Sequence, residues 1–322
     1  MACEEQNFFD KFWKPYLEFE ANLGFGLAQI REEIRFLDLQ PGERVANIGI
    51  NWGHSLQYIL EACPDVAGVV GIDSSQKMME LARTVFSEND FYLNEWLVGL
   101  APKARKYLTN LHEVAKANAD KVSFHFAPAE SINSFETQFD KIAATMGYHW
   151  LNDPKEDSFV SMNKSLRLGG QVVFSTASAF FECERGNYSF TLNPYYQSFF
   201  SVLERLYSSS VIGGKELRDK ELDSEEKKTG KFTLDGVVKT IQRAGFNLEH
   251  YHEHKMHINT EQIDTYCIAG VKFRYDSDGG DKVMKQLVDE TLKIAKSRFI
   301  YDHHPQQYEI CPIFRIKKVK EV

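Results

Sequence analysis

The residues with the clearest chemical potential lie in two apolar runs and the turns that end them. The run at 45–50, which contains Gly49, breaks into a turn at Gly53, and the run at 66–72 stops at Asp73. Apolar residues between the runs recur at helical spacing. Glycine lets the backbone approach a ligand closely, and an acid after a second strand can accept hydrogen bonds from both hydroxyls of a ribose. The pattern therefore predicts a strand–loop–helix–strand unit that binds a nucleoside.

A second candidate pair, His149 and Trp150, follows the expected fourth strand. A histidine can act as a general base near neutral pH. An indole N–H can donate a hydrogen bond to a carboxylate or hydroxyl group of a substrate. In the alternative interpretation, Trp150 packs under the sheet and His149 caps the loop. Both residues are candidates for the catalytic, substrate-facing part of a site.

Four histidines close together raise the question of a metal site. On a strand, His250, His252 and His254 would point to one face, and His257 follows them. Imidazole is a common ligand of zinc and other transition metals. However, alternate side chains on a strand are about 6.6 Å apart, which is wide for three ligands on one ion. A solvated face is favoured, and we predict no metal there or at His303 and His304.

These residues are positioned by alternating strands and helices. The apolar patterns predict strands at 44–50, 67–73, 122–126, 141–146, 171–175, 246–256 and 308–317. Helices are expected at 27–38, 76–87, 155–166, 233–244, 260–271 and 281–298. A turn at Leu168-Gly169-Gly170 precedes the fifth strand. This alternation predicts an α/β fold with a parallel sheet covered by helices on both faces.

Three segments interrupt the alternation. Residues 5–22 form an aromatic amphipathic helix in which Pro15 can introduce a kink or a break, and residues 90–118 form one or two inserted helices. Residues 177–230 are rich in aromatic side chains and then become charged. We expect the first and third segments to cover a substrate pocket, with Phe12, Tyr16, Phe180, Tyr195 and Tyr196 on its walls.

Composition excludes several classes of function. A net charge of −8 over 322 residues argues against a general nucleic-acid binder, which needs a basic surface. No stretch of 18 apolar residues predicts a membrane span, and the acidic start of the chain does not resemble a signal peptide. Five scattered cysteines without a Cys-x-x-Cys pair are typical of reduced thiols. We therefore expect a cytoplasmic protein.

Five motifs in a fixed order resemble class I S-adenosylmethionine-dependent methyltransferases of the small-molecule type. They are Ala46–Gly53, Gly71–Asp73, Ala127–Glu130, Phe139–Asp153 and Leu166–Gly170. The resemblance covers about residues 40–178 well and the remainder weakly. The fourth motif is also similar to that of insect juvenile hormone acid methyltransferases and trans-aconitate methyltransferases.

The resemblance implies a fold and a set of cofactor contacts. The fold is a Rossmann-like, mostly parallel sheet of seven strands. It has a helical cap at 1–39, a cofactor-binding core at 40–178, a lid or acceptor-binding insertion at 179–232, and the rest of the core at 233–322. The implied S-adenosylmethionine contacts are Asn47, Gly49, Asn51, Gly53, Asp73, Ser74, Met78, Ala129, Glu130 and Met146.

The first loop departs from the family pattern at two positions. The family has an acid that helps to hold the methionine amino group, and this chain has Asn47 there. The middle glycine of the family is replaced by Asn51, which tolerates positive φ better than most residues. Asn47 can accept a hydrogen bond but carries no charge.

The expected activity is methyl transfer to a small organic acceptor by in-line displacement. The aromatic segments suggest an apolar or unsaturated acceptor with one polar handle. One alternative is a methyltransferase-like protein that binds the cofactor in a regulatory or non-methylating role. A nicotinamide-dependent oxidoreductase is a third hypothesis, although the chain lacks a clean Gly-x-Gly-x-x-Gly. The sequence does not determine the acceptor atom or whether a general base is used. It also leaves the oligomeric state open, and a homo-oligomer is one possibility.

Overall fold

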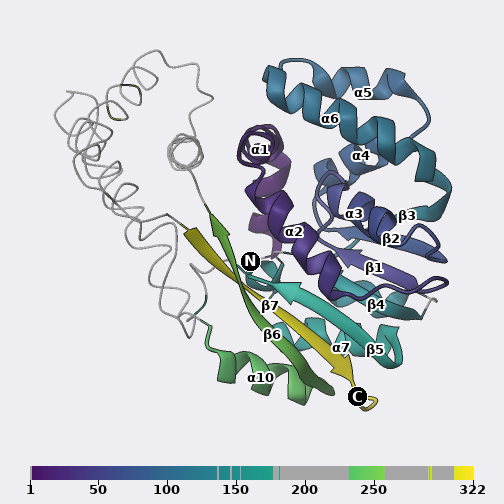
Figure 1. The fold of residues 1–322 in the computed structure, drawn as a ribbon, viewed down its shortest axis with the longest axis vertical. Helices are drawn as coiled ribbons and strands as arrows, with labels where there is room; N and C mark the ends of the chain where they lie inside the picture. Colours follow the sequence, from purple (N-terminus) through teal and green to yellow (C-terminus); the bar gives the residue numbers. More distant parts are fainter. Residues whose placement is uncertain are drawn as a thin grey trace. The chain divides into compact units, whose positions relative to one another are not determined.

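The computed structural model divides the chain into two compact units. Unit 1 comprises Met1–Ala177, Leu234–His254 and Cys311–Val322, and unit 2 comprises Ser178–Thr233 and Lys255–Ile310. The described residues are 2–135, 138–145, 147–152, 154–176, 181, 232–257, 289, 291 and 308–322. Unit 1 contains the sheet, its helices and most of the candidate residues (Figure 1).

The centre of unit 1 is one seven-stranded sheet in the order β3-β2-β1-β4-β5-β7-β6. Its strands are β1 (Arg44–Ile48), β2 (Gly68–Asp73), β3 (Val122–Phe126), β4 (Phe139–Ala144), β5 (Leu166–Ser175), β6 (Phe246–His257) and β7 (Tyr308–Lys318). The pairs formed by β1 to β5 are parallel, and β7 runs antiparallel to β5. The mostly parallel, seven-stranded sheet that the sequence predicted is confirmed.

The register brings the two motif-bearing strands to the same edge. Asn47 and Ile48 of β1 lie opposite Gly71 and Ile72 of β2, so both strands end at neighbouring positions. The last four residues of β1 are buried, as expected for a strand that is covered on both faces. The loop after β1 and the acid after β2 therefore meet.

Helices cover both faces of the sheet. On one face, α2 (Phe25–Phe36), α3 (His54–Ala62) and α4 (Gln76–Val85) form a continuous apolar core with strand residues such as Val45 and Val69. On the other, α7 (Lys155–Ser165) and α10 (Leu234–Arg243) pack against each other (Figure 1). Phe174 joins this second core by stacking on Phe314 at 4.8 Å and meeting Phe159 at 5.1 Å between ring centres.

The N-terminal helix and the insertion form an additional layer. Helix α1 (Ala2–Leu23) continues through Pro15 as one helix, so of the two possibilities, a kink or a break, the break is absent. The insertion contains two helices, α5 (Asp90–Leu97) and α6 (Pro102–Ala115), followed by the short 3-10 helix η1 (Lys116–Lys121). Helix α1 packs against both α4 and α6.

One predicted turn lies inside a strand. The sequence predicted that Leu168-Gly169-Gly170 would precede strand five, but β5 already begins at Leu166. Phe139 pairs with Leu166 and Lys141 pairs with Gln171, so the intervening residues of β5 form an irregularity in the ladder. Gly169 has a φ of +83°, a backbone conformation that glycine adopts more readily than other residues.

Candidate active site

The loop between β1 and α3 is a tight turn built on three left-handed residues. Gly49, Asn51 and Gly53 have φ values of 72°, 50° and 91°. The backbone N–H of Gly49 donates to the carbonyl of Ile72 at 2.8 Å, which ties the loop to the end of β2. Asn51 thus adopts the conformation that the middle position requires although it is not glycine.

Asp73 is the acid at the end of β2, and it is buried beneath this loop. Its Oδ2 accepts a hydrogen bond from the backbone N–H of Asn51 at 2.9 Å, and its Oδ1 accepts one from the N–H of Ser75 at 2.8 Å. Burial raises the pKa of Asp73 to about 6, against the lowering effect of these two hydrogen bonds. The carboxylate therefore joins the first loop to the start of α4.

Asn47 and its neighbours occupy the floor of the first loop. The Oδ1 of Asn47 accepts a hydrogen bond from the hydroxyl of Ser55 at 2.9 Å. The side chain is completely buried, and its Nδ2 has no hydrogen-bond partner in the described part of the chain. An uncharged amide with one free donor thus stands where the resembled family has an acid.

Ser74 and Met78, the two cofactor contacts predicted after Asp73, lie at the start of α4. Ser75 rather than Ser74 caps α4, because its side chain accepts from the N–H of Met78. Met78 itself is completely buried in the apolar core. Met78 therefore packs in the core of the fold. The N-cap of α4 is Ser75, so Ser74 does not cap this helix.

The segment after β3 lies next to Asp73. The N–H of Ala127 donates to the carbonyl of Asp73 at 3.0 Å, and the 3-10 helix η2 (Ala129–Ser134) follows. Glu130 accepts hydrogen bonds from Ser158 at 2.6 Å and from Asn152 at 3.3 Å, so it binds η2 to α7. Ala129 is buried beside it, and Met146, the last predicted cofactor contact, lies outside the described residues.

His149 and Trp150 belong to the short helix η3 (Tyr148–Trp150) after β4. Nδ1 of His149 lies 3.0 Å from the hydroxyl of Thr176, which follows β5. Burial, and secondarily the charge of Lys155, lowers the pKa of His149 to about 3. Trp150 is 44% exposed and meets the ring of Phe9 on α1 at 5.2 Å, so it does not pack under the sheet.

Of the predicted lid residues, only Tyr16 has a described side chain. Its ring meets that of Trp52, in the first loop, at 5.5 Å and 61°. Burial raises the pKa of the Tyr16 phenol, and the charges of Glu20 and Asp73 raise it further. Tyr16 therefore lies at the first loop, within electrostatic range of both carboxylates. The side chain of Phe12, and Phe180, Tyr195 and Tyr196 entirely, lie outside the described residues.

Sequence reasoning missed a clamp between α1 and α4. Oδ1 of Asp10 accepts hydrogen bonds from the hydroxyl of Ser75 at 2.6 Å and from the N–H of Lys77 at 3.0 Å. An acid is favourable at a helix N-terminus, where backbone N–H groups lack partners. Nothing in the spacing of the sequence could reveal that this acid comes from a helix more than 60 residues earlier.

Sequence reasoning also missed a set of buried polar side chains without partners. On α1, α2, β1 and α3 of the described chain, such atoms belong to Glu20, Gln29, Asn47, His54 and Gln57. Burial lowers the pKa of His54 to about 3, so its ring is neutral. Buried polar groups almost always have a hydrogen-bond partner, so such a concentration indicates a site for a polar ligand or water.

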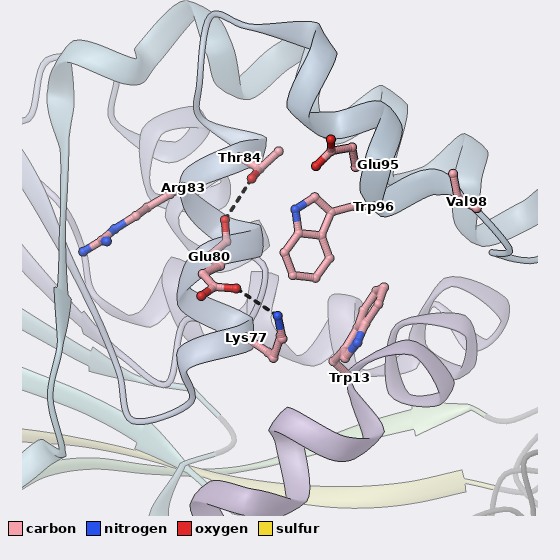
Figure 2. A pocket seen from close by; sticks show the side chains of 8 residues that line it. All are labelled: Trp13, Lys77, Glu80, Arg83, Thr84, Glu95, Trp96 and Val98. Atoms are coloured by element: carbon pink, nitrogen blue, oxygen red, sulfur yellow. Dashed lines mark hydrogen bonds and ion pairs between the residues drawn. The ribbon is translucent and has the colours of Figure 1, made fainter.

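A separate open pocket of about 540 Å³ lies on the outer side of α4 (Figure 2). Trp13 and Trp96 meet there edge to face at 4.9 Å, and Lys77 forms an ion pair with Glu80 at 3.1 Å. The remaining lining residues are Arg83, Thr84, Glu95 and Val98. None of the predicted cofactor-binding or catalytic residues lines this pocket.

The side chains of His250, His252 and His254 on β6 lie against α2. Ligand atoms of Glu32, His252 and His254 lie within 4.8 Å of one another. However, both carboxylate oxygens of Glu32 accept hydrogen bonds from Arg35, at 2.6 and 2.9 Å. His250 instead stacks on Phe36 at 5.0 Å. The three-histidine ladder thus has no common centre, and the absence of a metal stays a prediction.

Comparisons with known proteins give the fold a name. No protein-family model and no curated protein match the sequence. The cyclase SpnF is 14% identical, with a TM-score of 0.52 over 99% of this chain and 96% of that chain. A candidate methyltransferase from Bacillus halodurans C-125 is 14% identical, with a TM-score of 0.50 over 91% of this chain and all of that chain.

A third neighbour is an S-adenosylmethionine-dependent methyltransferase from Geobacter sulfurreducens, solved with S-adenosyl-L-homocysteine. It is 15% identical, with a TM-score of 0.47 over 94% of this chain and 96% of that chain. The chain therefore has the class I fold of small-molecule S-adenosylmethionine-dependent methyltransferases, including the antiparallel β7. Likeness at these identities establishes the fold and leaves the activity open. Among the described helices, none is both long and apolar enough to cross a membrane.

Proposed function

We propose that the protein binds S-adenosylmethionine at the ends of β1 and β2 and transfers its methyl group to a small organic acceptor. The observation that carries this proposal is the buried carboxylate of Asp73, which accepts the N–H of Asn51 from the glycine-containing loop. Parallel α/β sheets bind nucleosides at this edge, and an acid after the second strand suits a ribose.

Three features of the described residues fit this cofactor. The oxygens of Asp73 have acceptor capacity beyond the bonds to Asn51 and Ser75, because each carboxylate oxygen has two lone pairs. A Cβ at Gly49 would meet no atom within 4 Å, so the loop borders open space there. The unpartnered atoms of Asn47 and His54 offer hydrogen bonds for a polar amino-acid tail.

The protein's own residues would bind S-adenosylmethionine and align the acceptor with its methyl group. S-adenosylmethionine supplies the electrophilic methyl group, so the protein needs to orient the acceptor in line and exclude water. Asp73 would hold the ribose, and the first loop would approach the ligand through backbone atoms. The segment from Ala127 to Glu130 would contact the adenine, since Ala127 is hydrogen-bonded to the backbone of Asp73.

His149 is better suited to orient the acceptor than to remove its proton. A general base works best when its pKa lies near the working pH, and burial lowers the pKa of His149 to about 3. A neutral imidazole next to Thr176 can still exchange hydrogen bonds with a polar handle of the acceptor. This arrangement favours an acceptor that is already nucleophilic, such as a carboxylate or an amine.

The second candidate function is a cofactor-binding protein that does not methylate. It is motivated by the first loop, where Asn47 and Asn51 replace an acid and a glycine of the resembled family. The two functions share the binding site and differ in whether the bound cofactor gives up its methyl group.

Calorimetry and a methyl-transfer assay together test both functions. Titrations with S-adenosylmethionine, S-adenosylhomocysteine and NAD are expected to give binding of the first two only. Binding of NAD alone would overturn the proposal in favour of an oxidoreductase. Transfer of a labelled methyl group to small carboxylic acids or amines would then support methylation. Tight binding without transfer to any acceptor class would favour the second function.

A further inference from the structure

Glu20 is a buried carboxylate that forms no ion pair with any residue that the structure describes. It lies on α1 and is only 7% exposed. Its Oε2 has no hydrogen-bond partner, and Glu20 takes part in no ion pair within the described ranges. The N–H of Gly26 donates a hydrogen bond to the carboxyl group. A Cβ at Gly26 would lie 2.5 Å from Oε2, so glycine there permits the close approach.

An unpaired buried carboxylate is costly to keep in a folded protein. Removing a carboxylate from water without a counter-ion carries a penalty of several kcal/mol. Burial raises the pKa of Glu20 to about 7, which reflects this penalty. The charge of Glu20 acts on the phenols of Tyr16, Tyr58 and Tyr107. The causes of the raised pKa of Glu20 itself include no lowering by a cation. A cation from outside the chain would remove the penalty.

Glu20 lies on the first-loop side of the proposed ribose site. Tyr16 connects the two, because the charges of Glu20 and Asp73 both act on its hydroxyl. The ring of Tyr16 packs on Trp52, which belongs to the first loop. Trp52 in turn meets the ring of His54 at 5.0 Å, at the start of α3. Tyr16 therefore links Glu20 to the first loop, and a tail that extends from a ribose at Asp73 along this loop would approach the carboxylate.

The chemistry of the cofactor supplies the cation that this place lacks. S-adenosylmethionine carries a ribose at one end of its sulfur-bearing chain and an α-ammonium and a carboxylate at the other. The amide of Asn47 cannot neutralise an ammonium. Gln29, completely buried on α2, has both amide atoms unpartnered and adds neutral hydrogen-bonding capacity. Glu20 supplies a negative charge, and its Oε2 has no hydrogen-bond partner among the described residues.

We propose that Glu20 is the counter-ion of the α-ammonium group of S-adenosylmethionine, in place of the acid that the first loop lacks. This inference rests on the proposed cofactor and adds the residue that recognises its amino-acid end. A charge-assisted hydrogen bond from the ammonium to Oε2 would satisfy both groups. The selectivity for ligands with an amino-acid tail over plain nucleosides would then reside in α1.

The test compares three ligands that differ in their tails. All three are thioethers without a sulfonium charge: S-adenosylhomocysteine carries an ammonium and a carboxylate, decarboxylated S-adenosylhomocysteine (S-adenosyl-3-thiopropylamine) carries only an ammonium, and methylthioadenosine carries neither. Glu20→Gln is expected to weaken the first two by about 10- to 100-fold and to leave methylthioadenosine within about threefold. Glu18→Gln is the matched control, because it makes the same change on the same helix at a carboxylate that already accepts the N–H of Ala101.

The outcomes separate this inference from the proposed function. Equal weakening of all three ligands by Glu20→Gln, or weakening of none, would overturn the inference while cofactor binding stands. Failure of the unmodified protein to bind any of the three would overturn both. Thermal melting checks the fold of each variant. If Glu20→Gln does not fold, Glu20→Asp, which withdraws the carboxylate by one methylene, must still weaken the two ammonium ligands selectively.

Discussion

The backbone N–H of Asn51 donates a hydrogen bond of 2.9 Å to Oδ2 of Asp73, 22 residues further along the chain. The bond joins the loop after β1 to the end of β2. The carboxylate that would bind the ribose thus also holds the first loop in place. Binding energy at Asp73 and the conformation of the loop are therefore coupled.

Asp73→Asn is expected to weaken all nucleoside ligands together. The amide has one acceptor oxygen instead of two, so it cannot serve Asn51, Ser75 and two ribose hydroxyls. We expect a loss of at least about 10-fold for both methylthioadenosine and S-adenosylhomocysteine by calorimetry. Asp65→Asn, at an exposed position, is the control and should bind normally. Unchanged affinity of Asp73→Asn would show that the ribose lies elsewhere.

Three glycine-to-alanine variants can separate loop strain from ligand contact. Gly42, Gly49 and Gly53 all have positive φ, and a Cβ meets no atom within 4 Å at the first two. Gly42→Ala and Gly49→Ala should each lower the free energy of unfolding by about 1 kcal/mol. Of Gly42→Ala and Gly49→Ala, only Gly49→Ala should also weaken cofactor binding, because Gly42 lies outside the first loop.

Gly53→Ala should lower the free energy of unfolding more than Gly42→Ala or Gly49→Ala. A Cβ there would lie 2.9 Å from the ring of Phe86, so overcrowding adds to the strain of φ 91°. Urea denaturation measures all three variants. Equal affinity of Gly42→Ala and Gly49→Ala for S-adenosylhomocysteine would argue against a ligand at the first loop.

The fold was predictable because its signals are local. Each buried parallel strand is a short apolar run, such as the one that ends at Asp73, and the helices between strands have one apolar face. The order of these elements, together with the resemblance, predicted the sheet that the structure contains. The predicted turn before β5 is instead an irregularity inside the strand, because β5 already pairs with β4 at Leu166 and resumes pairing at Gln171.

The polar contacts of the site were not predictable because they join distant segments. Asp10 and Ser75 are 65 residues apart, and nothing in either residue type predicts that their side chains form a hydrogen bond. Glu20 looks like an ordinary surface acid on an amphipathic helix, and only tertiary packing buries it. The place of Asp73 at the end of a strand could be predicted from the sequence, and its role toward a ribose stays a prediction. The role proposed for Glu20 could not be predicted from the sequence, because it depends on how α1 packs against the first loop.

The imidazoles of His54 and His149 are expected to stay neutral from pH 5 to pH 8. Burial lowers both pKa values to about 3, because a charged ring would lose its hydration. Their NMR resonances, assigned with His54→Gln and His149→Gln, should not shift over this range. A midpoint near 6.5 for His149 would restore the general-base role that its sequence position suggested.

The ligand-free protein is expected to lose stability as the pH rises towards 7. The pKa of Glu20 is about 7 in the folded protein, against an ordinary value of 4.5. Below pH 4.5 the carboxyl is protonated in both folded and unfolded chains and costs nothing. At higher pH the unfolded chain releases its proton more readily, so the folded state loses stability, by about 3 kcal/mol above pH 7.

Glu20→Gln removes this loss, because an amide has no proton to release. The variant should therefore have a higher free energy of unfolding than the unmodified protein at pH 8, and the advantage should largely vanish at pH 4.5. Urea denaturation at both pH values measures it, with Glu18→Gln as the control that should show no such pH dependence. If the difference between Glu20→Gln and the unmodified protein is the same at both pH values, Glu20 is not an unpaired buried carboxylate. A pH-dependent gain combined with selective loss of ammonium ligands would mean that the fold tolerates a destabilising charge because the ligand neutralises it.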